Sequence, residues 1–362
     1  GQHEVRQRAA DGKTGQITYA FAGHGFISNA LNVHSKPSDL DLFLLLAIGE
    51  YLSATGDRTF LDEEVPFYPP DAPHNAPGTS VLDHIRFALK HLFEGIGIGD
   101  NGLIKVGSGD WSDSIVLETS LRDGIGPFGV TYQNSKDHGE SVPNTQMALY
   151  TLPLLAAVLK TRAPDVVELI QARLDGLRKA VSNQWNPAGW YNRAVLRGIN
   201  NAPVVLRRHD LEAQPWALIS GLAADDGTEA NLIEQTDSVL DRPSKIGATL
   251  VPRGMIWPAV SQLLTWGYAR AGRGELAWRS LNRNTFAAHA IEYPAVWFGI
   301  WSGPDGVHGV DARQPDIPGG SWTSPMTPMT DFPVMNANPD AMALLGLLRV
   351  CGIEPAPTGD GL

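Results

Sequence analysis

The chain has 362 residues, of which 43% are hydrophobic and 19% are charged. This composition excludes a disordered protein, which would carry more charge and fewer aromatic residues. Asp and Glu number 39 against 28 Lys and Arg, a balance of −11 that repels phosphate backbones and excludes nucleic acid as a partner. Cys351 is the single cysteine, so a disulfide framework and a cysteine-based zinc site are excluded, and no metal is expected.

The ends of the chain are polar. No apolar run approaches the roughly 20 residues of a membrane span, which excludes an integral membrane protein. Residues 1–15 lack the apolar stretch of a secretory signal, so a cytoplasmic location is expected. The missing initiator Met indicates an end that is processed or cut from something longer. We interpret residues 1–37 as an N-terminal extension or the remnant of a preceding segment, and residues 353–362 as the start of a C-terminal linker. The sequence gives no indication of the oligomeric state.

Hydrophobic patterning predicts a chain made mostly of helices. Densely apolar segments such as 142–161 alternate with amphipathic segments such as 165–184, as expected when buried inner helices pair with half-exposed outer helices. In chain order, the predicted helices are residues 38–54, 81–94, 142–161, 165–184, 214–223, 229–240, 257–271, 275–287 and 339–350. The predicted strands are few and short, at residues 102–106, 189–196 and 204–206.

This alternation predicts an all-α fold of the (α/α)6 barrel type, in which an outer ring of helices surrounds an inner ring. We assign the barrel to residues 38–352 as the catalytic domain, and expect it to be incomplete at the N-terminus because no helix is visible before residue 38. The 38 Gly and 26 Pro indicate long loops, which this fold gathers at the barrel mouth. The longest, 293–338, contains Trp301, which would either stack on a sugar ring or anchor the loop to the core.

A glycine-rich loop at 107–114 carries two carboxylates, Asp110 and Asp113, on either side of Trp111. A carboxylic acid beside an indole loses hydration, so its pKa rises and it can hold a proton near neutral pH. Such a group could protonate a glycosidic oxygen. The alternative is a turn in which Asp110 satisfies backbone amides and Asp113 caps a helix.

Five segments of the chain resemble, in the same order, segments of glycoside hydrolase family 94, the inverting cellobiose and related β-glucoside phosphorylases. The most specific is Gly-Asp-Trp-Ser-Asp at 109–113, which is similar to the family's Gly-Asp-Trp-Asn-Asp. The five segments are residues 38–44, 54–67, 107–113, 138–142 and 210–217. The resemblance implies inverting phosphorolysis of β-linked gluco-oligosaccharides in an (α/α)6 barrel.

The resemblance also implies roles for three residues. Asp113 falls on the general acid, whereas Asp39 and Trp111 match positions that hold the sugar in the subsite on the non-reducing side. Inorganic phosphate, a co-substrate, is then the nucleophile and arrives on the face opposite the acid. No cofactor and no second protein carboxylate are needed for that reaction, and the expected partner is an oligosaccharide.

The sequence departs from the family where phosphate should bind. The family's His and its Thr-Gly or Ser-Gly turn are replaced by residues 254–258 and 331–336, so the phosphate-binding residues are not identified. Asp331 would repel phosphate but would suit a general base that activates water, which describes an inverting hydrolase acting on β-glucans. Otherwise Asp331 caps or bridges loop backbone. A third hypothesis is a non-catalytic carbohydrate-binding module that keeps the Trp platforms without turnover.

Four further residues are candidates for sugar contacts. Glu140 and Asp210 stand at the starts of dense helices, where a carboxylate is stabilised as an anion that could bind sugar hydroxyls, or could simply serve as an N-cap. Gln214 and Trp216, one turn further on, are candidates for the wall of a subsite.

Overall fold

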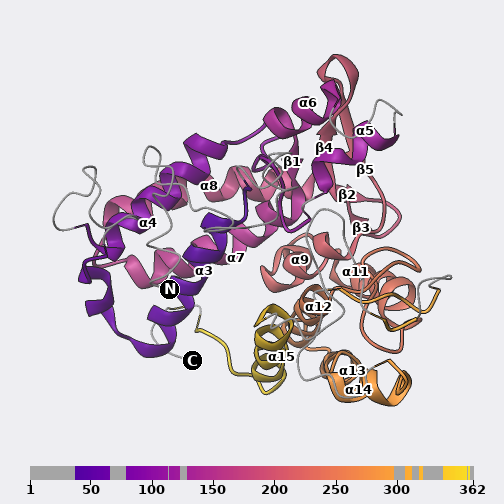
Figure 1. Ribbon diagram of the computed structural model, residues 1–362. Coiled ribbons are helices and arrows are strands. Elements are labelled where there is room, and N and C mark those ends of the chain that lie inside the picture. The colour runs from indigo at the N-terminus through magenta and orange to yellow at the C-terminus, as the bar shows by residue number, and fades with distance from the viewer. Residues whose placement is uncertain are drawn as a thin grey trace. The chain divides into compact units, whose positions relative to one another are not determined.

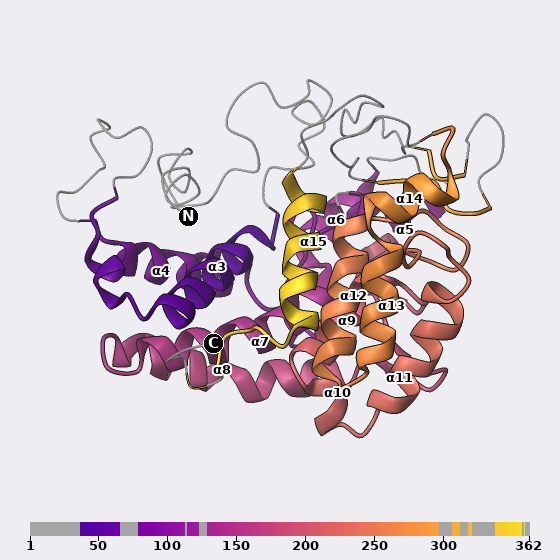
Figure 2. The same cartoon turned by 90° about the horizontal axis from the view of Figure 1, so that it is seen from below.

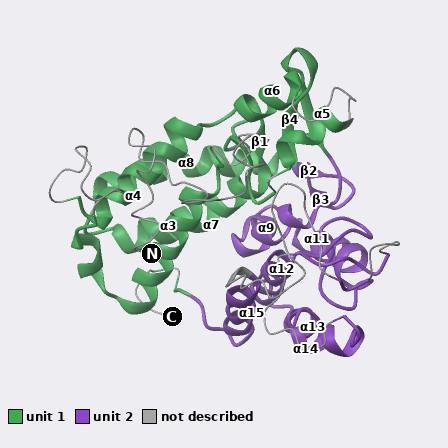
Figure 3. Cartoon of the chain, in the orientation of Figure 1, with its two compact units in different colours: residues 1–183, 194–206, 355–362 green, residues 184–193, 207–354 purple. Residues whose placement is uncertain are grey.

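The computed structural model describes residues 37–65, 79–112, 114–122, 129–296, 306–311, 318–320, 337–356 and 358. Helices dominate these residues (Figure 1), which confirms the all-α class. The chain forms two compact units (Figure 3): unit 1 comprises residues 1–183, 194–206 and 355–362, and unit 2 comprises residues 184–193 and 207–354. Closure of the helices into a double ring and the domain limits at residues 37 and 352 stay predictions.

Unit 1 is built around one buried helix, α7 (Val142–Leu159), which packs against both α3 and α8 (Figure 2). Ser141 caps its N-terminus by accepting a hydrogen bond from the Asn144 amide at 3.3 Å, and Pro143 occupies the first turn, where its missing N–H costs nothing. The remaining helices of unit 1 are α3 (Leu40–Thr55), η1 (Arg58–Asp62), α4 (Val81–Lys90), the π-helix η2 (His91–Ile96), η3 (Ile115–Leu117), α5 (Glu118–Arg122), α6 (Val130–His138), α8 (Pro164–Ser182) and η4 (Ile199–Asn201).

The core helix α7 corrects one expectation. Among the described residues it is long and apolar enough, by length and composition alone, to cross a membrane, and 83% of that stretch is buried inside the structure. Polar residues such as Asn144 and Thr145 interrupt the run, so it was not recognised as apolar over this length. Burial on nearly every side is what a helix at the centre of a folded unit shows.

Two short β-structures accompany the helices. In unit 1, β1 (Glu140–Ser141), β4 (Ala194–Arg197) and β5 (Pro203–Leu206) form an antiparallel sheet in the order β1-β4-β5, with Glu140 opposite Val195. In unit 2, β2 (Trp185–Asn186) pairs with β3 (Trp190–Tyr191). The prediction of a single strand at 189–196 is therefore wrong. The segment is divided into β3 and β4 at Arg193. The fully buried side chain of Arg193 pairs with Glu212 at 2.6 Å.

Unit 2 is centred on α12 (Pro258–Arg270), which packs against α9, α13 and α15 (Figure 2). Two segments that were each predicted as one helix are broken. Gly221, in the left-handed region at φ 79°, separates α9 from α10, and Thr285 caps a new helix, α14, by accepting from the Ala288 amide. Besides α12, the helices of unit 2 are η5 (Leu211–Ala213), α9 (Pro215–Ile219), α10 (Leu222–Asp225), α11 (Glu229–Thr236), the π-helix η6 (Asp237–Asp241), α13 (Gly274–Arg283), α14 (Phe286–Glu292) and α15 (Ala337–Val350).

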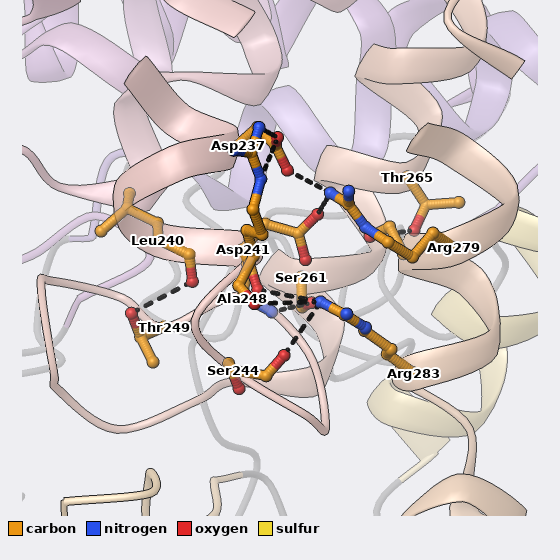
Figure 4. Close-up of polar contacts among 12 residues, drawn as sticks. Asp237, Leu240, Asp241, Ser244, Ala248, Thr249, Ser261, Thr265, Arg279 and Arg283 are labelled. Carbon is orange, nitrogen blue, oxygen red and sulfur yellow. Dashed lines mark hydrogen bonds and ion pairs between the residues drawn. The ribbon is translucent and has the colours of Figure 1, made fainter. Parts of the chain in front are cut away.

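Buried charges fasten the π-helix η6 to α13 (Figure 4). Arg279 donates to the carboxylate of Asp241 at 2.7 Å and also pairs with Asp237. Burial raises the pKa of Asp241, and the Arg279 guanidinium opposes that rise. One turn on, Arg283 donates to the carbonyl of Ser244 at 3.1 Å. Arg279 therefore offsets the charge of the carboxylates that the π-helix turns toward α13, and Arg242 also pairs with Asp237.

Replacing Arg279 with Leu should destabilise the protein by about 3 kcal/mol, because two buried carboxylates lose their shared partner. The matched control is Arg86→Leu, which breaks the exposed Arg86 pair with Asp165 and should cost less than about 1 kcal/mol. Urea unfolding of the full chain measures both values. Equal losses for the two variants would contradict the structural role of the buried network.

Two buried histidines of unit 2 should make stability depend on pH. Burial lowers the pKa of His209 and of His289 from 6.5 to about 4. His209 stacks on Trp190 with ring centroids 4.7 Å apart. Nε2 of His289 lies 2.8 Å from the carbonyl oxygen of Ile246. Between pH 6.5 and pH 4 these histidines are protonated in the unfolded chain but not in the folded chain, so stability falls as the pH falls.

Each of these histidines should therefore cost about 2 kcal/mol of stability at pH 5 relative to pH 7. His209→Phe, which keeps an aromatic ring against Trp190, should reduce the pH dependence of urea unfolding by that amount. His138→Gln, at an exposed position of α6, is the control and should leave the dependence unchanged. The same pH dependence in both variants would overturn this assignment for His209.

Candidate active site

The glycine-rich loop at 107–112 lies in unit 1 and is held at both ends by backbone hydrogen bonds. The Val106 amide donates to the carbonyl of Gly139 at 2.8 Å, and the Ser38 amide donates to the carbonyl of Gly109 at 3.0 Å. Gly107 adopts φ 61°, a left-handed conformation that favours glycine. The loop is therefore fixed against the segment that leads into α3.

Side chains from the start of α7 complete this clamp. Asp110 is 2% exposed, and its carboxylate accepts hydrogen bonds from the Ser112 amide at 3.0 Å and from Ser141 Oγ at 2.7 Å. Asn144 Nδ2 donates to Ser38 Oγ at 2.7 Å. For Asp110 the turn interpretation is thus confirmed, because this carboxylate organises the loop and its attachment to α7. We call residues 107–112, with their contacts to Ser38, Ser141 and Asn144, the clamped loop.

Trp111 extends from the clamped loop as a half-buried side chain. Its ring packs edge to face against Phe43 of α3, with centroids 5.3 Å apart and planes at 83°. This contact fixes the orientation of an indole that retains exposed surface. An oriented, partly exposed indole is suited to stacking on a sugar ring.

Asp39 occupies the N-cap position of α3, where its side chain makes no capping hydrogen bond. Burial, together with the charge of the neighbouring Asp110, raises the pKa of Asp39 from 3.8 to about 7. The structure therefore brings Asp39 and Trp111 to the same junction between α3 and the clamped loop. Asp113, the expected general acid, follows Trp111 by two positions and lies outside the described residues.

Glu140, considered either as a sugar contact or as the N-cap of α7, is a buried residue that supports a turn. The side chain has no exposed surface, and it accepts hydrogen bonds from Asn101 Nδ2 at 2.7 Å and from the Leu103 amide at 3.2 Å. Arg197 Nη2 lies 3.4 Å from it. Burial raises the pKa of Glu140. These contacts make Glu140 the support of the turn at 99–103, and the N-cap of α7 is Ser141 instead.

Asp210 of unit 2 acts as an N-cap, one of the two roles considered for it. Its side chain accepts from the Glu212 amide at 3.3 Å at the start of η5 and pairs with Arg208 at 2.9 Å. Only 2% of Asp210 is exposed. Its described contacts are therefore structural.

Gln214 and Trp216 were expected to line a subsite, but both lie in the core of unit 2. Gln214 is fully buried and pairs with the backbone of Tyr191: Oε1 accepts from the amide at 2.9 Å, and Nε2 donates to the carbonyl at 3.1 Å. Trp216 is 2% exposed and meets Trp266 edge to face at 5.8 Å. The paired amide bonds tie β3 to the start of α9, and the indole fills the space between α9 and α12.

Two other predicted site residues, Trp301 and Asp331, lie outside the described residues. Sequence reasoning missed the roles of Ser38, Ser141 and Asn144 in holding the clamped loop. Only the Ser141 to Asn144 spacing, typical of a capped helix start, offered a signal. In the part of the chain that the structure describes, no three or more His, Cys, Asp and Glu side chains gather where they could hold a metal ion.

Comparison with known proteins gives the family. The catalytic domain of the glycosyl hydrolase 94 superfamily matches residues 28–253, a range that contains the clamped loop, α3 and α7. Solabiose phosphorylase of Paenibacillus borealis is 29% identical over 221 residues, which are 57% of this chain and 24% of that protein. The chain thus spans about a quarter of the length of this curated relative. Neutral trehalase Nth1 from Saccharomyces cerevisiae aligns with 88% of this chain and 64% of its own, at 10% identity and a TM-score of 0.49.

The family match covers more than half of the chain and includes each segment in which the sequence resembled family 94. The chain therefore belongs to the glycosyl hydrolase 94 superfamily, a family of carbohydrate-active enzymes, through its catalytic domain.

Proposed function

We propose that the chain carries the catalytic domain of an inverting glycoside phosphorylase acting on β-linked gluco-oligosaccharides. The observation that carries this proposal is the clamped loop, which presents Trp111 beside Asp39 within the range matched by the family. The phosphorylase relative, whose name refers to solabiose, supports phosphorolysis over hydrolysis. Inorganic phosphate would be the co-substrate, with no cofactor.

The proposed reaction assigns one task to each group. Trp111 supports one face of the sugar, and Asp39 binds a hydroxyl in the same subsite. Asp113 donates its proton to the glycosidic oxygen as the bond from that oxygen to the anomeric carbon breaks. Phosphate attacks the anomeric carbon from the opposite face, so a β-linkage yields an α-sugar 1-phosphate and a free acceptor sugar. The groups that bind phosphate stay unassigned.

Phosphate dependence tests the proposed reaction. The full chain would be incubated with cellobiose, laminaribiose, sophorose or solabiose, with and without inorganic phosphate, and products followed by ³¹P NMR. The expected result is α-glucose 1-phosphate that forms only when phosphate is present. Release of glucose at a rate indifferent to phosphate would favour the hydrolase with Asp331 as base, and binding without any release would favour a carbohydrate-binding module.

Asp113→Asn tests the general acid. The substitution should lower kcat on the natural disaccharide by at least about 100-fold, because proton donation contributes 10²–10⁴ in rate. β-Glucosyl fluoride has a leaving group that needs no proton, so the variant should turn it over with phosphate at close to the wild-type rate. Asp137→Asn, which removes an exposed carboxylate on α6, is the control and should leave kcat unchanged. Full disaccharide activity in Asp113→Asn, or an equal loss with the fluoride, would disprove the assignment.

A further inference from the structure

The backbone brings two carboxylates to one place in unit 1. The hydrogen bond from the Ser38 amide to the Gly109 carbonyl, 3.0 Å long, joins the residues that immediately precede Asp39 and Asp110. Pro37 and Gly107 form an antiparallel bridge just before it, so the two segments run side by side there. Asp110 is almost fully buried and Asp39 half-buried. Two carboxylates in such surroundings do not both ionise readily, because each charge opposes the other.

The two carboxylates have unequal support. Asp110 accepts hydrogen bonds from Ser141 Oγ and from the Ser112 amide, an arrangement that suits an ionised carboxylate. Asp39 makes no capping hydrogen bond at the start of α3. Hydrogen bonds from its own backbone and from that of Leu40 lower the pKa of Asp39, but burial and the charge of Asp110 raise it more. The negative charge of the pair therefore belongs on Asp110, and the proton belongs on Asp39.

The other charges around Asp39 act in the same direction or are already paired. Asp41, in the first turn of α3, also opposes ionisation of Asp39, and Asp41 is itself paired with His91 Nδ1 of η2 at 2.5 Å. The α7 helix presents no acid or base apart from Tyr150, which donates to Glu50 at 3.2 Å. On α4, the buried His84 contacts the carbonyl of Val65. Among the described residues, no cation is one of the main influences on the pKa of Asp39.

We propose that Asp110 is a positioning residue that keeps Asp39 protonated at neutral pH, so that Asp39 donates a hydrogen bond to a sugar hydroxyl. The sugar contact rests on the proposed function, whereas the protonation of Asp39 does not. The pKa of Asp39, raised to about 7 by burial and by Asp110, agrees with this arrangement. A neutral Asp39 also leaves one negative charge fewer beside the clamped loop, which favours the approach of phosphate.

The pH dependence of KM tests the donor role. With Asp39 titrating at about 7, the protonated fraction falls about tenfold between pH 6 and pH 8, so the KM for the disaccharide should rise about tenfold. In Asp110→Asn the rise should begin at lower pH, because the charge that holds the proton on Asp39 is gone. In Asp39→Asn, whose amide always donates, KM should no longer change over this range. A wild-type KM that falls with rising pH would show that an ionised acceptor is needed and would overturn the proposal.

A direct titration separates this inference from the proposed function. The carboxyl carbons of ¹³C-labelled aspartates are followed by NMR in the full chain, with the Asp39 signal assigned by its loss in Asp39→Asn. We expect the Asp39 signal to titrate with a midpoint near pH 7. This midpoint should move to lower pH in Asp110→Asn and stay unchanged in the control Asp137→Asn. A midpoint near 4 in the wild type would overturn the proposal even if phosphorolysis is observed. If no disaccharide is turned over, or if Asp110→Asn does not fold, the wild-type titration still decides whether Asp39 is protonated at neutral pH.

Discussion

The hydrogen bond between the Ser38 amide and the Gly109 carbonyl is the constraint on which the candidate active site depends. It joins segments 71 residues apart, and it aligns the start of α3 with a loop that has no regular structure of its own. Ser141 and Asn144 add side-chain bonds from the start of α7 to the same junction. With these in place, Trp111 and Asp39 have fixed positions although neither belongs to the interior of a helix or strand.

A second feature recurs in both units: polar side chains tie together segments that are distant in the sequence. Glu140 holds the turn at 99–103 through its carboxylate, and Gln214 holds β3 through its amide. The π-helix η6 is likewise tied to α13 by Arg279. Each of these groups would be costly to bury without its partners, so each makes its local structure depend on a contact that is distant in the sequence.

The long helices could be predicted because their signals are local. The ends of α7 and α8 lie within two residues of the predicted ends, owing to an N-cap at Ser141 and prolines in the first turns. The short helix α6 was missed because it is mostly polar, and it is stabilised by contacts such as Ser135 Oγ with the carbonyl of Arg197. The hydrophobic pattern of the sequence carries no signal for such a contact. The prediction of one strand at 189–196 was wrong for the same reason, because the break at Arg193 follows from its pairing with Glu212, which lies further along the chain.

The site was predictable only in part. Resemblance to the family selected Asp39 and Trp111, and the structure puts both at the clamped loop. Position one turn beyond Asp210 selected Gln214 and Trp216, which are buried, because residue type and position do not distinguish an amide that binds backbone from one that binds sugar. The raised pKa of Asp39 was equally hidden, because it comes from burial and from Asp110, 71 positions away in the chain.

We propose that sugar binds at the clamped loop. Indole ¹H–¹⁵N spectra of the full chain, titrated with each of cellobiose, laminaribiose, sophorose and solabiose, test it most directly, with Trp111→Phe identifying the Trp111 signal. The Trp111 resonance should shift with at least one disaccharide, because this indole is partly exposed, whereas those of Trp216 and Trp266, at 2% and 1% exposure, should stay in place. A Trp111 signal that stays fixed while another indole responds to the sugar would contradict the account.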